Sequence, residues 1–155
     1  LNLEFFSSNL YLQMSGWCSI NGFDGASSFL RKHSSEEMMH MSKMFDYLAD
    51  NNEMPIIGTI IKPQTDFDSM EKLLRKAYEH EKIITKKIND LSNIAIKSED
   101  YTTFHFLQWY VFEQQEEEKL FQSVLNKLDL ARSNDNNGVG IFLLDKELME
   151  MSKLK

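Results

Sequence analysis

The sequence of 155 residues contains few residues that interrupt helices or cross-link a chain: one cysteine, two prolines and six glycines. A single cysteine cannot form an internal disulfide, which fits a reducing compartment such as the cytoplasm. No apolar run approaches the roughly 20 residues that span a bilayer. The net charge of -7 disfavours a nucleic-acid binder, which needs a basic surface. An acidic chain is better suited to binding cations.

The first ten residues carry no basic segment of the kind that opens a secretory signal peptide. The chain also begins with leucine and not with methionine, and we therefore expect further residues upstream. Neither a membrane nor a nucleic acid is expected as a partner.

The sequence between the few prolines and glycines predicts long helices. β-branched and polar residues do not alternate over the length of a strand, so we predict an all-α fold. Asn21-Gly22 is expected to end the first helix, and Asp24 to cap the second. A single domain is predicted over 1–155, with a four-helix bundle over about 1–129, a loop over about 130–141 and a short helix over about 142–152.

The connection over residues 53–68 is unusually long for a helix bundle. A helix of about 28 residues is about 42 Å long, and sixteen extended residues reach about 50 Å. This segment can therefore run the whole length of the bundle and make the second and third helices parallel. The prediction is four long helices with one long crossover.

Each of the four long helices carries a carboxylate in phase with its apolar residues. These are Glu4, Glu37, Glu81 and Glu117, and Gln114 lies in phase beside Glu117. A lone buried carboxylate is costly, so these acids predict a shared cation. The depths along the helices agree within one turn except for Glu4, which lies about 7 Å further along and needs a tilt or an irregular turn.

Residues 37–40 read Glu-Met-Met-His, an E-x-x-H motif. Its spacing puts the carboxylate of Glu37 and the imidazole of His40 on one helical face. This mixture of oxygen and nitrogen ligands suits iron with open coordination positions.

A second group of acids comprises Glu36, Glu113, Glu116 and Glu117, which can form an additional cation site beside the first. The alternative is a solvated charged face, to which we assign Glu118. Tyr11 shares a face with Glu4, and either ordinary packing or a redox or proton role fits it. His33, His80 and His105 are expected at the surface or behind the ligands, and Cys18 as a small buried apolar residue.

Several segments together closely resemble bacterial non-haem ferritins, in order and over nearly the whole chain. They are NLEFFSSNLYLQMS, FLRKHSSEEMMHM, YEHEKIITKKINDL, FLQWYVFEQQEEEKLF and FLLDKEL. The resemblance implies a ferritin-like four-helix bundle with one long crossover and a short fifth helix. It also implies that the family's first helix begins about three turns before Leu1.

The resemblance further implies a di-iron ferroxidase centre. The first iron would be held by Glu4, Glu37 and His40, with Glu37 as the bridge, and the second by Glu81 and Glu117. Glu36, Glu113 and Glu116, with Glu117 shared, match the third iron site of the bacterial proteins. Gln114 would lie beside the ligands, and Tyr11 matches a tyrosine next to the centre.

The function implied is iron storage. Fe(II) is oxidised by O2 or H2O2, and ferric oxyhydroxide is deposited inside a homo-oligomeric shell of twenty-four subunits. No haem is expected, because residues 114–117 read Gln-Gln-Glu-Glu where haem-containing relatives carry a second E-x-x-H. The alternatives are a non-storing di-iron oxidase or peroxidase, and a structural bundle whose acids pair with its lysines.

Overall fold

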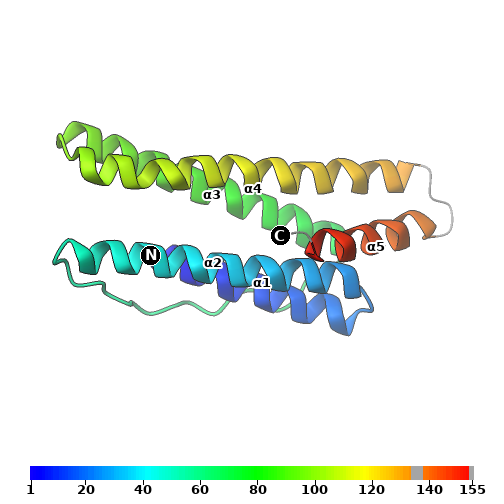
Figure 1. Cartoon of the computed structure of the whole chain (residues 1–155). Coiled ribbons are helices and arrows are strands. Elements are labelled where there is room, and N and C mark those ends of the chain that lie inside the picture. The colour runs from blue at the N-terminus through cyan, green and yellow to red at the C-terminus, as the bar shows by residue number, and fades with distance from the viewer. Residues whose placement is uncertain (134–137, 154–155) are drawn as a thin grey trace. The chain divides into compact units, whose positions relative to one another are not determined.

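The computed structural model describes residues 1–133 and 138–153, and this part of the chain forms five helices (Figure 1). They are α1 (Asn2–Ile20), α2 (Asp24–Asp50), α3 (Met70–Lys97), α4 (Tyr101–Ser133) and α5 (Val139–Lys153). No strand occurs among these residues, which confirms the all-α prediction. None of the described helices combines the length and apolar character that crossing a bilayer requires.

The chain forms two compact units. The first comprises residues 1–70 and 131–155, and the second comprises residues 71–130. In the first unit, α2 packs against both α1 and α5. The assignment of all residues to one domain stays a prediction.

The turn between α1 and α2 has the expected glycine signature. Gly22 has a φ of 80°, in the left-handed region that favours glycine. The amide of Phe23 donates to the carbonyl of Cys18 (2.9 Å), and the amide of Gly22 donates to that of Ser19 (3.3 Å). These two bonds form a Schellman motif and end α1 where the sequence predicted.

The crossover follows α1 from one end to the other. The side chain of Asn2, at the start of α1, donates to the carbonyl of Ile56 (3.0 Å) and accepts from the amide of Gly58 (2.8 Å). Near the other end of α1, the ring of Trp17 meets that of Phe67 edge to face at 6.0 Å. The predicted length-spanning course of this segment is confirmed (Figure 1).

The start of α2 is capped from α5, and not by Asp24 as predicted. The N-cap residue is Phe23, which makes no side-chain capping bond. The carboxylate of Asp145 instead accepts from the amides of Gly25 (3.0 Å) and Ala26 (2.8 Å). Because this cap comes from a residue distant in sequence, local sequence rules could not find it.

The predicted loop over about 130–141 is too long at both ends. Helix α4 continues to Ser133 and α5 already begins at Val139, while residues 134–137 lie outside the described part. No proline or glycine occurs between 130 and 137, so nothing in the sequence stops α4 earlier.

Candidate metal centre

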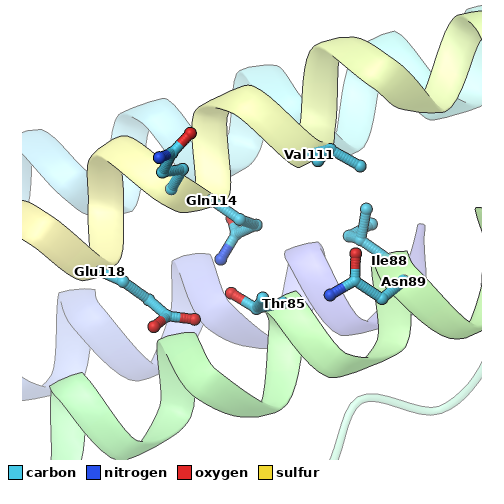
Figure 2. Close-up of a pocket in the computed structure, with 7 residues that line it drawn as sticks. Thr85, Ile88, Asn89, Val111, Gln114 and Glu118 are labelled. Carbon is cyan, nitrogen blue, oxygen red and sulfur yellow. The ribbon is translucent and has the colours of Figure 1, made fainter.

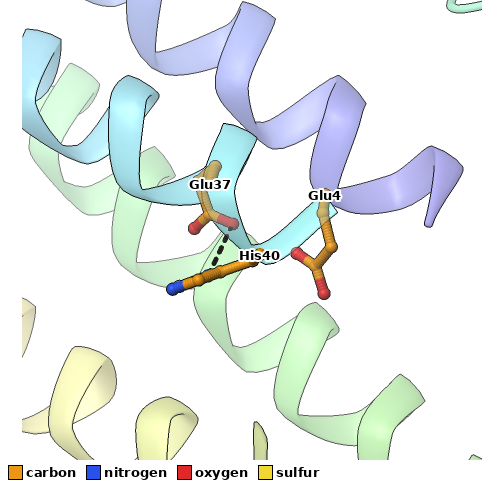
Figure 3. A group of neighbouring side chains, drawn as sticks. All are labelled: Glu4, Glu37 and His40. Carbon is orange, nitrogen blue, oxygen red and sulfur yellow. Dashed lines mark ion pairs between the residues drawn. The ribbon is translucent and has the colours of Figure 1, made fainter. Parts of the chain in front are cut away.

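In the first unit, α1 and α2 bring three predicted ligands together (Figure 3). Glu4, Glu37 and His40 are all buried, and each offers a ligand atom within 4.8 Å of the other two. Nδ1 of His40 lies 3.3 Å from Oε2 of Glu37, as the i, i+3 spacing predicts. The E-x-x-H motif thus faces Glu4 on the neighbouring helix.

The position of Glu4 needs neither the tilt nor the irregular turn that the sequence analysis required. The midpoint of the α1–α2 turn is Gly22, from which Glu4 and His40 lie the same number of residues away. Two antiparallel helices therefore place these two residues at one height. The predicted offset of about 7 Å for Glu4 was too large because it compared Glu4 with Glu37, which lies nearly one turn closer to Gly22 than His40 does.

The chemistry of Glu4 fits a cation. Its side chain is only 3% exposed, and among the described residues Oε2 accepts no hydrogen bond. An ionised carboxylate in such a place is costly unless a positive charge compensates it. Two carboxylates and one imidazole form a mixed ligand set that suits iron and other borderline divalent cations.

In the second unit, α3 and α4 bring Glu81 and Gln114 together. Both are buried, and Nε2 of Gln114 donates to Oε2 of Glu81 at 2.9 Å, with the carbonyl of Glu81 at 3.4 Å. This bond orients the carboxylate of Glu81. Glu117, one turn further along α4, is also buried.

The predicted members of the additional site differ in exposure. Glu36 is partly buried on α2, where Oε1 lies 3.4 Å from Nζ of Lys32 and Oε2 lies 3.3 Å from Nδ1 of His33. On α4, Glu113 is partly buried and Glu116 is exposed.

His33 lies away from the surface, so of its two predicted positions the one behind the ligands remains. It is buried directly beside Glu36, and its ring packs against those of Phe29 (4.4 Å) and Tyr11 (6.3 Å). Tyr11 is itself fully buried. A signal was present: residues 33–40 read His-x-x-Glu followed at once by Glu-x-x-His, so both His–Glu pairs have i, i+3 spacing.

The other two histidines that the sequence analysis named, His80 and His105, differ in burial. His80 is buried, and this burial, together with the charge of Lys76, lowers its pKa to about 4. His105 is exposed, as the surface alternative predicted.

Comparisons with known proteins agree with this geometry. The model of the ferritin-like domain family matches residues 1–131. The chain is 51% identical over 148 residues to the bacterial non-heme ferritin of Escherichia coli, an alignment that covers 96% of this chain and 88% of that protein. The chain belongs to the ferritin family. It is also 49% identical to a probable bacterial non-heme ferritin-like protein of Haemophilus influenzae, with 98% and 90% of the two chains covered.

Solved ferritin structures have the same fold. An open pore ferritin from the archaeon Archaeoglobus fulgidus superposes with a TM-score of 0.91 at 35% identity, covering 96% of this chain and 89% of that one. The Chlorobium tepidum ferritin gives 0.84 at 42% identity, with coverages of 96% and 90%. These similarities confirm the predicted ferritin-like all-α bundle and the prediction of an iron-storage ferritin.

Proposed function

We propose that this ferritin oxidises Fe(II) at a di-iron ferroxidase centre before storing it as ferric oxyhydroxide. The observation that carries the proposal is the buried Glu4–Glu37–His40 cluster, in which Oε2 of Glu4 has no hydrogen-bond partner among the described residues. We assign these three residues to the first iron, with Glu37 as the bridge, and Glu81 and Glu117 to the second.

The chemistry of these residues suits this reaction. Carboxylates bind both Fe(II) and Fe(III) and can change between bridging and terminal binding, while an imidazole adds one neutral ligand. A bridging carboxylate would hold two Fe(II) ions close enough to give two electrons to one molecule of O2 or H2O2. We assign to Gln114 the task of holding the carboxylate of Glu81 in a fixed orientation.

We further propose a third iron site formed by Glu36, Glu113 and Glu116 with Glu117 shared. It would adjust the stoichiometry of oxidation or the transfer of iron away from the centre. Tyr11, buried near His33, is the candidate for an electron or proton donor beside the centre.

The mineral requires an enclosed space, which one chain of this size cannot provide. We therefore propose a closed homo-oligomeric shell, with twenty-four subunits by similarity to the family. Because the single cysteine is buried and forms no disulfide, we propose a cytoplasmic location. No haem is part of this proposal.

Aerobic addition of a large excess of Fe(II), followed by size-exclusion chromatography with iron and protein detected together, tests the proposal. We expect far more than a few iron ions per chain to co-elute with a very large assembly, and Glu37→Ala to slow the oxidation strongly. About two ions per chain on a small oligomer would instead favour a non-storing di-iron oxidase or peroxidase. Equal oxidation rates for Glu37→Ala and the unaltered protein would reject the assigned centre.

A further inference from the structure

Glu36, which we assign to the third iron, has a different partner at each of its two carboxylate oxygens. Oε2 lies 3.3 Å from Nδ1 of His33, and Oε1 lies 3.4 Å from Nζ of Lys32. All three residues belong to α2, where spacings of three and four residues bring them to one face of the helix. The side chain of Glu36 is 26% exposed, so a cation from solvent can reach its carboxylate.

His33 is a fixed partner of Glu36. Its side chain is buried, and its ring meets that of Phe29 edge to face at 4.4 Å and that of Tyr11 at 6.3 Å. Phe29 and Tyr11 are buried as well. Because interiors are closely packed, the imidazole cannot turn without moving these two rings. Nδ1 of His33 therefore keeps its place beside Oε2 of Glu36.

Lys32 is an exchangeable partner of Glu36. Its side chain is 30% exposed, and its ammonium group ends a flexible four-carbon stem. Ion pairs as exposed as this one contribute little to stability. A divalent cation carries twice the charge and binds carboxylate oxygens directly, so it can displace the ammonium group from Oε1.

The pocket of the second unit has no such arrangement. It has a volume of about 290 Å³ between α3 and α4 (Figure 2), and among the described residues that line it only Glu118 is charged. One carboxylate among neutral groups attracts a divalent cation weakly. The rest of the lining is Thr85, Ile88, Asn89, Val111, Gln114 and Gln115.

We propose that His33 is a positioning residue that holds Oε2 of Glu36 for the cation, and that Lys32 competes with the cation for Oε1. His33 thereby strengthens cation binding by Glu36, whereas Lys32 weakens it. A site with a competitor beside it binds iron less tightly than its carboxylates alone would, which suits a site that passes iron on. The inference rests on the proposed third iron site and names two side chains that set its affinity.

Titration of the assembled protein with Zn²⁺ in a calorimeter tests the role of His33. Glu36→Gln identifies the third site as the binding event that this variant loses. His33→Leu removes the donor and keeps an apolar side chain between the two rings. His33→Asn keeps a donor, since Nδ2 of asparagine takes about the place of Nδ1 of histidine, and it removes the imidazole as a possible ligand. His105→Leu, at an exposed position of α4, is the control.

Lys32→Met tests the competition in the same titration. Lys86→Met is the matched control, because it also removes one positive charge and an i, i+4 ion pair, that of Lys86 with Asp90 at 2.7 Å on α3. Since Lys32 is partly exposed, this variant tests the inference even if the buried His33→Leu fails to fold.

For His33→Leu we expect the third binding event to weaken about tenfold or more, as is typical when the partner that orients a ligand is lost. His33→Asn should restore most of this affinity. Lys32→Met should strengthen the event about two- to fivefold, the effect of one exposed ion pair. The first two binding events should not change in any of these variants, and neither control should change the third.

Three results would overturn the inference. They are unchanged third-site affinity in His33→Leu, equal weakening in His33→Asn and His33→Leu, which would make His33 a ligand, and no gain in Lys32→Met beyond that in Lys86→Met. If Glu36→Gln binds as many Zn²⁺ ions as the unaltered protein, the proposed third site itself fails, and this inference fails with it. The oxidation centre is judged separately by Glu37→Ala.

Discussion

Glu4 on α1 and His40 on α2 lie at equal sequence distances from Gly22 and offer ligand atoms within 4.8 Å of each other. The position of the glycine turn therefore decides whether a carboxylate from the first helix can join the E-x-x-H motif of the second. Insertion or deletion of a residue on one side of this turn would shift one partner by about 1.5 Å and rotate it by about 100°.

Replacing Glu4 by glutamine should raise the stability of the metal-free protein and weaken its binding of metal. The substitution removes a buried charge, so the metal-free protein should become more stable by about 1 kcal/mol, which raises Tm by about 2–4 °C. The affinity for the first divalent cation should fall about tenfold or more, because a ligand is lost. Calorimetric unfolding and titration with Zn²⁺ measure the two effects, and the exposed Glu79→Gln is the control. A lower Tm with unchanged Zn²⁺ affinity would contradict the role given to Glu4.

Replacing Gln114 by leucine should destabilise the metal-free protein by about 1–3 kcal/mol, because Oε2 of the buried Glu81 loses its donor. Urea unfolding measures the effect. Gln122→Leu is the matched control, since that glutamine makes its 2.9 Å bond to Asn126 in an exposed position, and its loss should cost far less. In a double-mutant cycle with Glu81→Leu, the Gln114 effect should largely disappear. Additive effects would show that the bond contributes little.

Two glycines in helices should respond to alanine in opposite directions. A Cβ on Gly25 would lie 1.6 Å from the carbonyl oxygen of Asp145 and 2.6 Å from its carbon, so α5 would have to move. We expect Gly25→Ala to destabilise by about 1–3 kcal/mol. A Cβ on Gly16 meets nothing within 4 Å, and Gly16→Ala should stabilise α1 by about 0.5–1 kcal/mol.

Amide hydrogen exchange of α5 tests why Gly25→Ala and Gly16→Ala should differ in stability. Faster exchange in α5 is expected only for Gly25→Ala, because the clash separates Asp145 from the start of α2. Similar exchange of α5 in both variants would mean that the contact with Asp145 does not hold this helix.

Cys18 should react slowly with thiol reagents, and it should make the free energy of unfolding change with pH in the alkaline range. Burial, with a smaller effect of the Asp145 charge, raises the pKa of its thiol from 9.0 to about 12. Below pH 9 the folded protein should hold about a thousandfold less thiolate than the unfolded chain, and thiol-labelling rates should differ accordingly. Because the folded pKa is the higher one, the contribution to stability is complete below pH 9 and is lost as pH rises toward 12.

Cys18→Ala is the control for this pH dependence. The variant should lose the part of the alkaline stability change that belongs to the thiol, although the smaller side chain lowers stability at every pH. Labelling of Cys18 as fast in the folded as in the unfolded protein at pH 8 would contradict its burial.

The sequence by itself determined the features that depend on neighbours along the chain. Helical periodicity placed Glu37 and His40 on one face, few breakers gave long helices, and Asn21-Gly22 ended α1. The crossover length also follows from the sequence alone, because the reach of an extended segment depends only on its number of residues. In the second unit, phase correctly predicted the burial of Glu81 and Gln114.

Tertiary structure decided the features that depend on which atoms of distant segments meet. Periodicity shows on which face of its helix a residue lies, but not which residue of another helix or turn it contacts. It could therefore not show that Gln114 donates a hydrogen bond to Glu81, or that His33 is buried beside Glu36. Nor could it show that Asp145, about 120 positions away, replaces Asp24 as the cap of α2. The pocket at Thr85 likewise exists only because α3 and α4 pack at this distance, since a cavity is the space that two packed surfaces leave unfilled.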